Sequence, residues 1–153
     1  MVLLRKASPA DTPAVGDILS EFIDTTPWMP RLHTVDEDRD FCAGLIAEGV
    51  VTIAEDAERI TGFIALRGDE IDALYVTRSA RRQGIGSQLL NHAKTCRACL
   101  ELWTFQANAS AIRFYRRAGF EEVLRTGGQD NEERLPDMRM RWMRDAQGQE
   151  ARS

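Results

Sequence analysis

The sequence predicts an α+β fold: a central mixed, mostly antiparallel sheet of about seven strands, with about four helices on both faces. Three β-rich runs joined by short polar connections over residues 49–76 are typical of an antiparallel meander. The last run leads through a glycine loop into an amphipathic helical pattern and then into another strand pattern at residues 99–105. A strand–helix–strand unit implies one parallel pair, so we expect a mixed sheet.

The length and charge of the chain limit its organisation. With 153 residues it suits one core, and we expect one domain over residues 1–143. The hydrophobic fraction of 43% is ordinary, and a net charge of −4 argues against general attraction to nucleic acid or anionic membranes. Residues 144–153 have no apolar periodicity, so we expect a disordered tail there.

Targeting and metal signals are missing from the sequence. No run approaches the roughly 18 apolar residues of a membrane span, and the first residues place apolar groups before charges, the reverse of a signal peptide. We therefore expect a cytoplasmic protein with no membrane partner. The three cysteines, Cys42, Cys96 and Cys99, are an odd count and predict reduced thiols. The two histidines, His33 and His92, lie far apart in the sequence, so no metal is implied.

The first third of the chain predicts a strand and two helices. Residues 2–7 form a short β pattern, and the apolar spacing over 15–23 predicts a helix that ends before the prolines of residues 27–30. Thr34 and Glu37 have the spacing of a capping box that opens a second helix. The residues expected on its inner face are Phe41, Leu45 and Ile46.

The loop between these helices contains aromatic, basic and titratable side chains. Trp28, Arg31 and His33 lie in it, and Glu37 follows at the start of the next helix. Loops with such residues often bind ligands, since rigid elements hold them while their side chains stay accessible. The alternative is that Trp28 and Met29 only close the edge of the core, with His33 at the surface.

The remaining elements follow from alternation, caps and turns. Asn108 is a plausible N-cap of a helix that ends at Gly119. The segment 126–136 is polar and too long for a tight turn. The expected strands lie at residues 49–54, 59–66, 71–76, 99–105, 120–125 and 137–143, and a helix follows the glycine loop to about residue 97.

The glycine loop has the chemistry of an anion site. The first turn of a helix offers backbone N–H groups without intrahelical partners and partial positive charge. Gly84 and Gly86 allow close approach of the backbone, and Arg81 and Arg82 add full charges just before them. A phosphate or pyrophosphate is the expected ligand.

Two common phosphate loops do not fit. A P-loop requires Lys and then Ser or Thr after its last glycine, whereas Ser87 and Gln88 follow here. A dinucleotide-binding loop requires a third Gly or Ala at the position of Leu89.

Arg81, Gly84 and Gly86 do resemble the R/Q-x-x-G-x-G/A acyl-CoA loop of the GNAT (GCN5-related N-acetyltransferase) family. Residues 108–120 resemble that family's N-x-x-A-x-x-F-Y-x-x-x-G-F segment at every specified position. The likeness covers roughly residues 2–143 and is weakest before residue 50. It implies the GNAT fold, with the order β-α-α-β-β-β-α-β-α-β-β.

The resemblance implies acetyl-CoA as acetyl donor. Backbone groups of the strand before the loop would pair with the pantetheine arm, loop N–H groups would hold the pyrophosphate, and Asn108 and Tyr115 would lie beside the thioester. The cofactor-binding residues so implied are Leu74, Tyr75, Val76, Arg81, Arg82, Gln83, Gly84, Ile85, Gly86, Ser87, Asn108 and Tyr115.

The implied reaction is direct attack of a primary amine on the thioester in a ternary complex. Tyr115 would protonate the leaving thiolate, although a packing role alone would also explain it, and the N–H of Val76 would hold the oxyanion. Asp72 is the first candidate for the base, since alternation places it on one sheet face with Glu70, Leu74 and Val76. Glu70, His33 and Glu37 are other candidates.

We therefore expect an N-acetyltransferase acting on a small molecule, peptide or protein amine. Trp28, Arg31, His33 and Glu37 are the expected acceptor-binding residues. The acidic run 36–38 would suit a cationic acceptor, or serve only the helix dipole. The alternative is a catalytically silent acyl-CoA-binding regulatory module, which could dispense with Tyr115. A homodimer formed through Trp28, Trp142 and the last strands is compatible with either.

Overall fold

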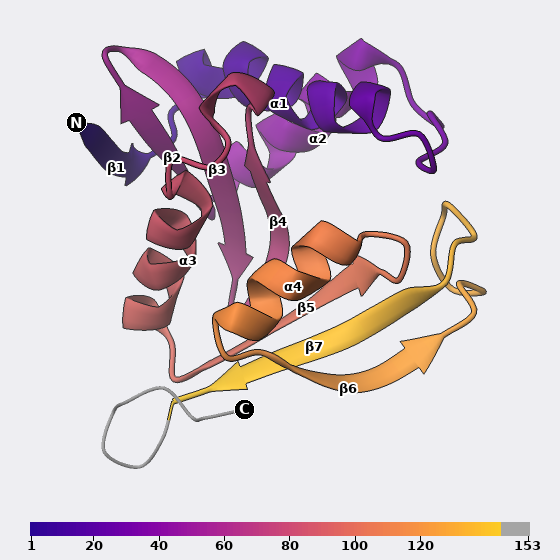
Figure 1. Ribbon diagram of the computed structural model, residues 1–153. Coiled ribbons are helices and arrows are strands. Elements are labelled where there is room, and N and C mark those ends of the chain that lie inside the picture. Colours follow the sequence, from indigo (N-terminus) through magenta and orange to yellow (C-terminus); the bar gives the residue numbers. More distant parts are fainter. Residues whose placement is uncertain (145–153) are drawn as a thin grey trace.

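Seven strands form one sheet in the order β1-β2-β3-β4-β5-β7-β6. In the computed structural model, which describes residues 1–144, every neighbouring pair is antiparallel except β4 and β5. Figure 1 shows β5, β6 and β7 running obliquely to the first four strands. The mixed, mostly antiparallel sheet is confirmed. The strands are β1 Val2–Lys6, β2 Val51–Asp56, β3 Arg59–Arg67, β4 Glu70–Val76, β5 Cys99–Phe105, β6 Glu121–Thr126 and β7 Asp137–Met143.

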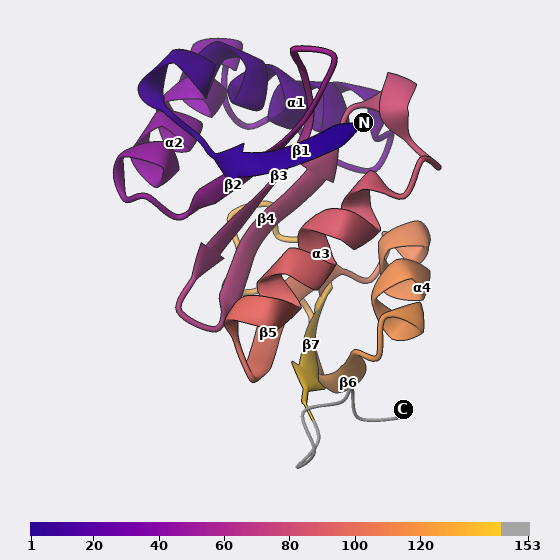
Figure 2. The same cartoon turned by 90° about the vertical axis from the view of Figure 1, so that its left-hand side faces the viewer.

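Helices cover both faces of the sheet, as expected. They are α1 Thr12–Thr25, α2 Val35–Ala47, α3 Ile85–Cys96 and α4 Ala109–Arg117. Figures 1 and 2 show α1 and α2 together on one side, and α3 and α4 on the other. Single 3-10 turns at Pro9–Asp11 and Arg78–Ala80 precede α1 and α3. The predicted order of strands and helices is confirmed.

Two apolar cores result from this layering. The core under α3 and α4 contains Leu89, Ile112 and Phe120, and the core under α1 and α2 contains Val15 and Phe63. The α1–α2 contact depends on Gly16, because a Cβ there would lie 2.9 Å from the Cα of Arg39. The two helices can pack this closely only around a residue without a side chain.

The capping box of α2 forms as the sequence predicts. The Thr34 hydroxyl accepts a hydrogen bond from the Glu37 N–H at 3.1 Å, and the Glu37 carboxylate accepts one from the Thr34 N–H at 2.9 Å. The prediction for the inner face of this helix was wrong at one position. Phe41 is 54% exposed, and Cys42 packs inward instead. Asp38, Cys42, Leu45 and Ile46 share the buried face, as helical spacing requires.

The expected alternation along β4 was also wrong. Ala73 pairs with Ala65 but Ile71 pairs with Leu66, so Asp72 is an additional residue in a β-bulge. Ile71 consequently joins Leu74 and Val76 in the core under α3 and α4. Asp72 faces the opposite side, toward α1 and α2.

The C-terminal end of the sheet corrects one further expectation. Trp142 is only 1% exposed, so it cannot provide the dimer contact that we expected of it. Its ring packs in the core with the Lys94 ammonium 5.1 Å from the ring centroid. Arg144 continues the sheet by donating its N–H to the Ala98 carbonyl at 2.8 Å, and residues 145–153 of the expected tail lie outside the described residues. Within residues 1–144, no helix is long and apolar enough to cross a membrane.

Candidate active site

The parallel strands β4 and β5 separate after a short contact. Their pairing is limited to Glu70 with Glu101 and Ile71 with Leu102. Beyond these pairs a gap opens, lined by residues 71–75 of β4 and residues 102–105 of β5. Among residues 1–144, the second half of β4 therefore pairs only with β3.

Backbone groups of β4 face this gap. The N–H of Thr77 donates to the Thr61 carbonyl of β3 at 2.8 Å. Because successive N–H groups of a strand point to opposite sides, the N–H groups of Leu74 and Val76 point away from β3. With the carbonyls of the same residues they form a short row of donors and acceptors that have no partner within residues 1–144, suited to pairing with an extended amide-bearing ligand.

A groove of about 440 Å³ runs from the gap past the start of α3. The predicted cofactor-binding residues that it brings together are Leu74, Tyr75, Val76, Arg81, Gly86, Asn108 and Tyr115. It leaves Arg82, Gln83, Gly84, Ile85 and Ser87 outside its lining. Backbone N–H groups were the expected contribution of Gln83, Gly84, Ile85 and Ser87, and side-chain charge that of Arg82. The Ile85 side chain itself belongs to the core.

The loop before α3 presents its backbone as an anion site would require. Gly84 caps the helix in the left-handed region with φ of +78°, and Arg82 also has a positive φ, of +67°. The first helical hydrogen bond runs from the Gln88 N–H to the Gly84 carbonyl at 3.0 Å. The preceding N–H groups of the first turn remain available for a ligand.

A contact from α1 supports this loop. One oxygen of the Glu21 carboxylate accepts hydrogen bonds from the Thr77 hydroxyl at 3.0 Å and from the Arg78 N–H at 2.7 Å. On the other side, the Arg59 guanidinium donates to the Ser79 hydroxyl at 2.8 Å. Sequence reasoning missed Glu21, because nothing in an α1 residue signals a partner 56 positions away.

Tyr115 projects from α4 to the point where the groove meets the gap. It lines both, and its ring packs edge-on against Phe114 and Phe120 at centroid distances of 5.2 and 5.3 Å. Burial raises the pKa of Tyr115, so its phenol stays protonated at neutral pH. The side chain thus has the protonation state that a proton donor needs.

Trp28 lies over the groove and is separated from the other expected acceptor residues. Its ring packs against Phe22 of α1 at 6.4 Å and Phe105 of β5 at 5.7 Å, and Phe22 in turn contacts Tyr75 at 4.8 Å. This aromatic cluster joins the first helix to both strands of the gap. Trp28 contributes one wall of the groove.

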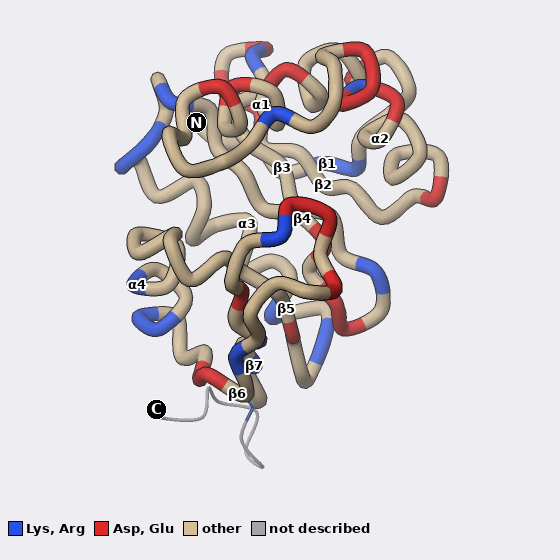
Figure 3. Tube along the Cα trace, turned by 90° about the vertical axis from the view of Figure 1, so that its right-hand side faces the viewer, with Lys and Arg blue, Asp and Glu red and all other residues tan. Residues whose placement is uncertain are grey.

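A second cavity, of about 660 Å³, lies on the α1–α2 side of the sheet. Tyr75 lines both this cavity and the groove. Apart from one histidine, every charged side chain in its lining is acidic: Glu37, Asp38, Asp40, Asp72, Glu132 and Glu133. Figure 3 looks onto this side of the molecule, with acidic segments on α2 and along the loop between β6 and β7.

His33 joins the two loops that border this acidic cavity. Its Nε2 contacts the Glu132 carboxylate of the β6–β7 loop, and its Nδ1 lies 3.7 Å from the Glu37 carboxylate. The hydrogen bond to Glu132 is the main reason that the pKa of His33 is raised, followed by the charges of Glu132 and Glu37. Below that pKa the imidazolium holds the two loops together.

Of the two carboxylates at the start of β4, Asp72 is the one open to the acidic cavity. Burial raises the pKa of Asp72, and the Arg67 guanidinium 3.5 Å away partly opposes this. Glu70 is instead held by two hydrogen bonds of 2.7 Å from Arg139. The bulge at Asp72 therefore gives these neighbours different environments.

Arg31 does not line either cavity. Its guanidinium donates to the Asp24 carboxylate at 2.6 Å, the Asp38 carboxylate at 2.9 Å and the His33 carbonyl at 2.7 Å. These contacts hold the α1–α2 loop in place. The acidic residues Glu132 and Glu133 were missed, since the only signal for them was a polar segment too long for a tight turn.

Comparisons with known proteins point to acetyltransferases. Residues 47–122 match the family described as "Acetyltransferase (GNAT) domain". Peptidyl-lysine N-acetyltransferase YiaC of Escherichia coli K12 is 29% identical over 146 residues, which cover 92% of this chain and 96% of that protein.

Solved structures show the same fold. The apo form of YjaB from Escherichia coli has a TM-score of 0.77 at 22% identity, over 92% of this chain and 97% of its own. YncA from Salmonella typhimurium, a putative acetyltransferase solved with acetyl-CoA, has a TM-score of 0.72 at 20% identity, over 95% of both chains.

Proposed function

Since this chain is an acetyltransferase that belongs to the GNAT family, we propose that it transfers acetyl from acetyl-CoA to a lysine-type primary amine of a peptide or protein. Transfer occurs by direct attack in a ternary complex. No metal takes part in this proposal, which uses only side chains and backbone groups of the site.

The observation that carries the proposal is the meeting of two cavities at the β4–β5 gap. The groove on one face has free strand amides and a basic loop, which suit a pantetheine arm and a pyrophosphate. The cavity on the other face has a carboxylate lining, which suits a cationic amine. Two substrates can thus approach the same point from opposite sides.

The groups at the gap match the steps of the transfer. A lysine amine, with a pKa of about 10.4, must lose a proton before it attacks the thioester. Asp72 accepts that proton, directly or through water, and the outward N–H of Val76 stabilises the oxyanion. Tyr115 donates its proton to the thiolate as the carbon–sulfur bond breaks.

The acceptor class rests on the acidic cavity and on the relatives. The YiaC and YjaB proteins are named peptidyl-lysine N-acetyltransferases. A long alkyl chain that ends in an ammonium group matches a deep acidic cavity whose wall includes Leu19, Ile23 and Tyr75. A small cationic amine fits the same chemistry and is the second candidate.

The test is acetylation of lysine peptides, with thiol release and peptide mass as readouts. We expect one acetyl group per accessible lysine and one thiol released for each acetyl group transferred. Double-reciprocal plots of initial velocity at several concentrations of the second substrate should give intersecting lines. Parallel lines would indicate a covalent acetyl-enzyme and contradict the ternary complex. Acetyl-CoA binding without thiol release from any peptide or small amine would favour a silent acyl-CoA-binding module.

A further inference from the structure

A third cavity, of about 330 Å³, lies between the end of β5 and the β6–β7 loop. It shares no lining residue with the groove or the acidic cavity, and it borders the β4–β5 gap through residues 103–105. Its lining is Trp103, Thr104, Phe105, Thr126, Asp130, Asn131 and Asp137. No step of the proposed reaction uses Trp103 or Asp130.

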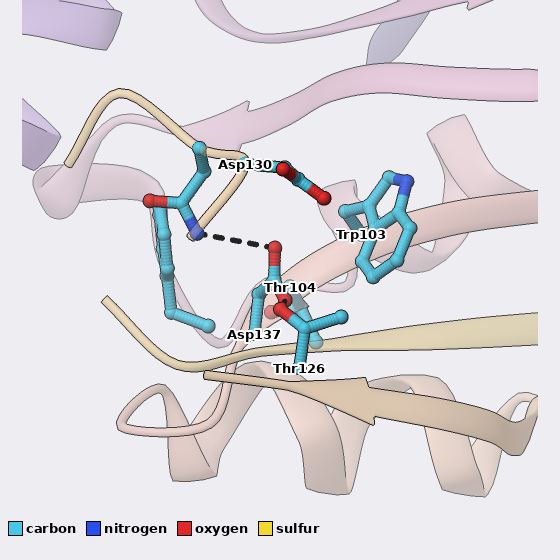
Figure 4. A pocket seen from close by; sticks show the side chains of 7 residues that line it. Trp103, Thr104, Thr126, Asp130 and Asp137 are labelled. Carbon is cyan, nitrogen blue, oxygen red and sulfur yellow. Dashed lines mark hydrogen bonds between the residues drawn. The ribbon is translucent and has the colours of Figure 1, made fainter. Parts of the chain in front are cut away.

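Two of its carboxylates differ in their environment. Asp137 is satisfied from within the protein, because its oxygens accept hydrogen bonds from the Thr126 hydroxyl and from the Asn131 amide. Asp130 has no hydrogen bond or ion pair with any described residue. Figure 4 shows the Asp130 carboxylate pointing toward the Trp103 ring.

Trp103 offers a large aromatic surface to this cavity. It is 47% exposed, unusual for a tryptophan in a sheet strand. Arg139, its cross-strand neighbour, lies 5.4 Å from the ring centroid and is outside the cavity lining. The charge of Arg139 is already balanced by two hydrogen bonds to Glu70 and by Glu101 at 3.5 Å.

An aromatic face beside an unpaired carboxylate favours binding of a cation, and it suits an arginine side chain best. A guanidinium is planar, stacks on indole rings and presents a fork of donors that matches a carboxylate. The Thr104 and Thr126 side chains that also line the cavity add polar contacts at its wall. A lysine ammonium would bind less well, because it is more strongly hydrated and cannot stack.

The β6–β7 loop separates this cavity from the acidic cavity. Asp130 and Asn131 line one, and Glu132 and Glu133 line the other. Consecutive residues span only about 3.8 Å, so the two cavities lie within reach of one peptide. An extended peptide with a lysine in the acidic cavity could place a nearby side chain against Trp103.

We propose that the Trp103–Asp130 cavity is a specificity subsite that binds an arginine side chain one to three residues from the lysine to be acetylated. This inference rests on the proposed function, because it assumes a peptide acceptor. Arginine binding at the subsite lowers the KM for the peptide and leaves the acetyl transfer itself unchanged.

The test compares matched peptides that contain one lysine and carry arginine or glutamine at each nearby position. Wild-type protein should acetylate the best arginine peptide with a kcat/KM about 3- to 10-fold above its glutamine counterpart, through KM. Asp130→Asn and Trp103→Ala should each bring this ratio close to one. Glu58→Gln, an exposed acid in the β2–β3 turn, is the matched control and should retain the wild-type ratio.

Two results would overturn the subsite: no arginine preference at any position in wild-type protein, or a preference that both variants retain. Absence of peptide acetylation by wild-type protein would instead contradict the proposed function. A binding readout separates these cases, because the indole N–H resonance of Trp103, identified with Trp103→Phe, should shift with arginine peptide and not with glutamine peptide. If that resonance does not respond, the subsite is wrong even where turnover occurs.

Discussion

Two tyrosines line the gap, Tyr75 from β4 and Tyr115 from α4. Burial raises the pKa of both, to about 12 for Tyr75. Tyr75 packs between Phe22 and Phe63 and lines both the groove and the acidic cavity. Tyr115 lines the groove and the gap and is not in the lining of the acidic cavity. The position of Tyr115 favours the proton-donor role for it.

Replacing Tyr115 tests that role. Tyr115→Phe keeps the ring packing against Phe114 and Phe120 and removes only the hydroxyl. We expect kcat to fall by about 100-fold or more, the usual contribution of a general acid, with acetyl-CoA affinity nearly unchanged. Steady-state thiol release and calorimetric titration of acetyl-CoA measure the two quantities. A variant with the full wild-type rate would show that the tyrosine only packs.

Asp72 links activity to stability through its raised pKa. As a base it acts when deprotonated, so kcat/KM should rise with pH through its pKa, and Asp72→Asn should lose that rise. The folded state binds this proton more tightly than the unfolded chain does, so ionisation of Asp72 destabilises the fold. The contribution of Asp72 to the free energy of unfolding is most favourable at low pH, where the carboxyl is protonated, and is lost as the pH rises through its raised pKa.

Asp72→Asn should therefore raise the melting temperature at pH 7 while lowering activity. Thermal unfolding at pH 7 and a pH–rate profile check both parts. Loss of activity together with a lower melting temperature would indicate a structural role, and an unchanged pH profile would shift the base assignment to His33 or Glu37.

At the scale of elements, β4 serves both faces of the sheet. Its bulge turns Asp72 toward the acidic cavity, while separation from β5 frees the amides of Leu74 and Val76. A regular strand with a full partner on each side would present neither. The two irregularities of β4 therefore account for how one strand borders both the groove and the acidic cavity.

Helix caps provide a matched pair of variants. Asn108 accepts a hydrogen bond from the Ala111 N–H at 3.2 Å, as Thr34 does from Glu37. Asn108→Ala and Thr34→Ala should each lower the free energy of unfolding by about 1 kcal/mol. Only Asn108→Ala should also raise the KM for acetyl-CoA, because Asn108 lines the groove. Urea unfolding measures the loss of stability, and steady-state kinetics measure the KM. If Asn108→Ala has the wild-type KM for acetyl-CoA, Asn108 serves only as a helix cap.

At the scale of the whole molecule, the groove is built from segments distant in the chain. Residues of α1, β4, the loop before α3, and α4 all contribute to its lining. A ligand in the groove would contact all of these segments, so its binding should stabilise the fold as a unit. Ligand at 100 times its Kd adds about 2.7 kcal/mol.

Acetyl-CoA should accordingly raise the melting temperature by about 5–10 °C under that condition. Gly86→Glu should abolish the shift, because its side chain would enter the groove beside Phe114 and carry negative charge toward the pyrophosphate. Gly86→Ala is the control, since a Cβ there would lie 3.5 Å from Phe114, an ordinary contact. No shift in the wild-type protein would contradict acetyl-CoA as donor.

Local sequence patterns were sufficient for the elements and for the cofactor loop. The capping box of Thr34 and the alternation over 99–105 depend on neighbours close in the chain, so they can be recognised without a fold. The anion site expected before α3 is equally local, because the helix supplies its own donors and Arg81 lies just upstream. The family resemblance rests on such segments, and both the family and the fold are confirmed.

Tertiary structure alone decided how the acceptor side is built. The bulge at Asp72 results from the register between β3 and β4, which alternation cannot reveal. Trp28 and Arg31 were expected to act with His33, but packing directs Trp28 to the cofactor groove and Arg31 into ion pairs. Glu132 and Asp130 reach their cavities because the β6–β7 loop contacts His33 and borders the end of β5. Each depends on contacts between distant parts of the chain, whose geometry only the folded molecule determines.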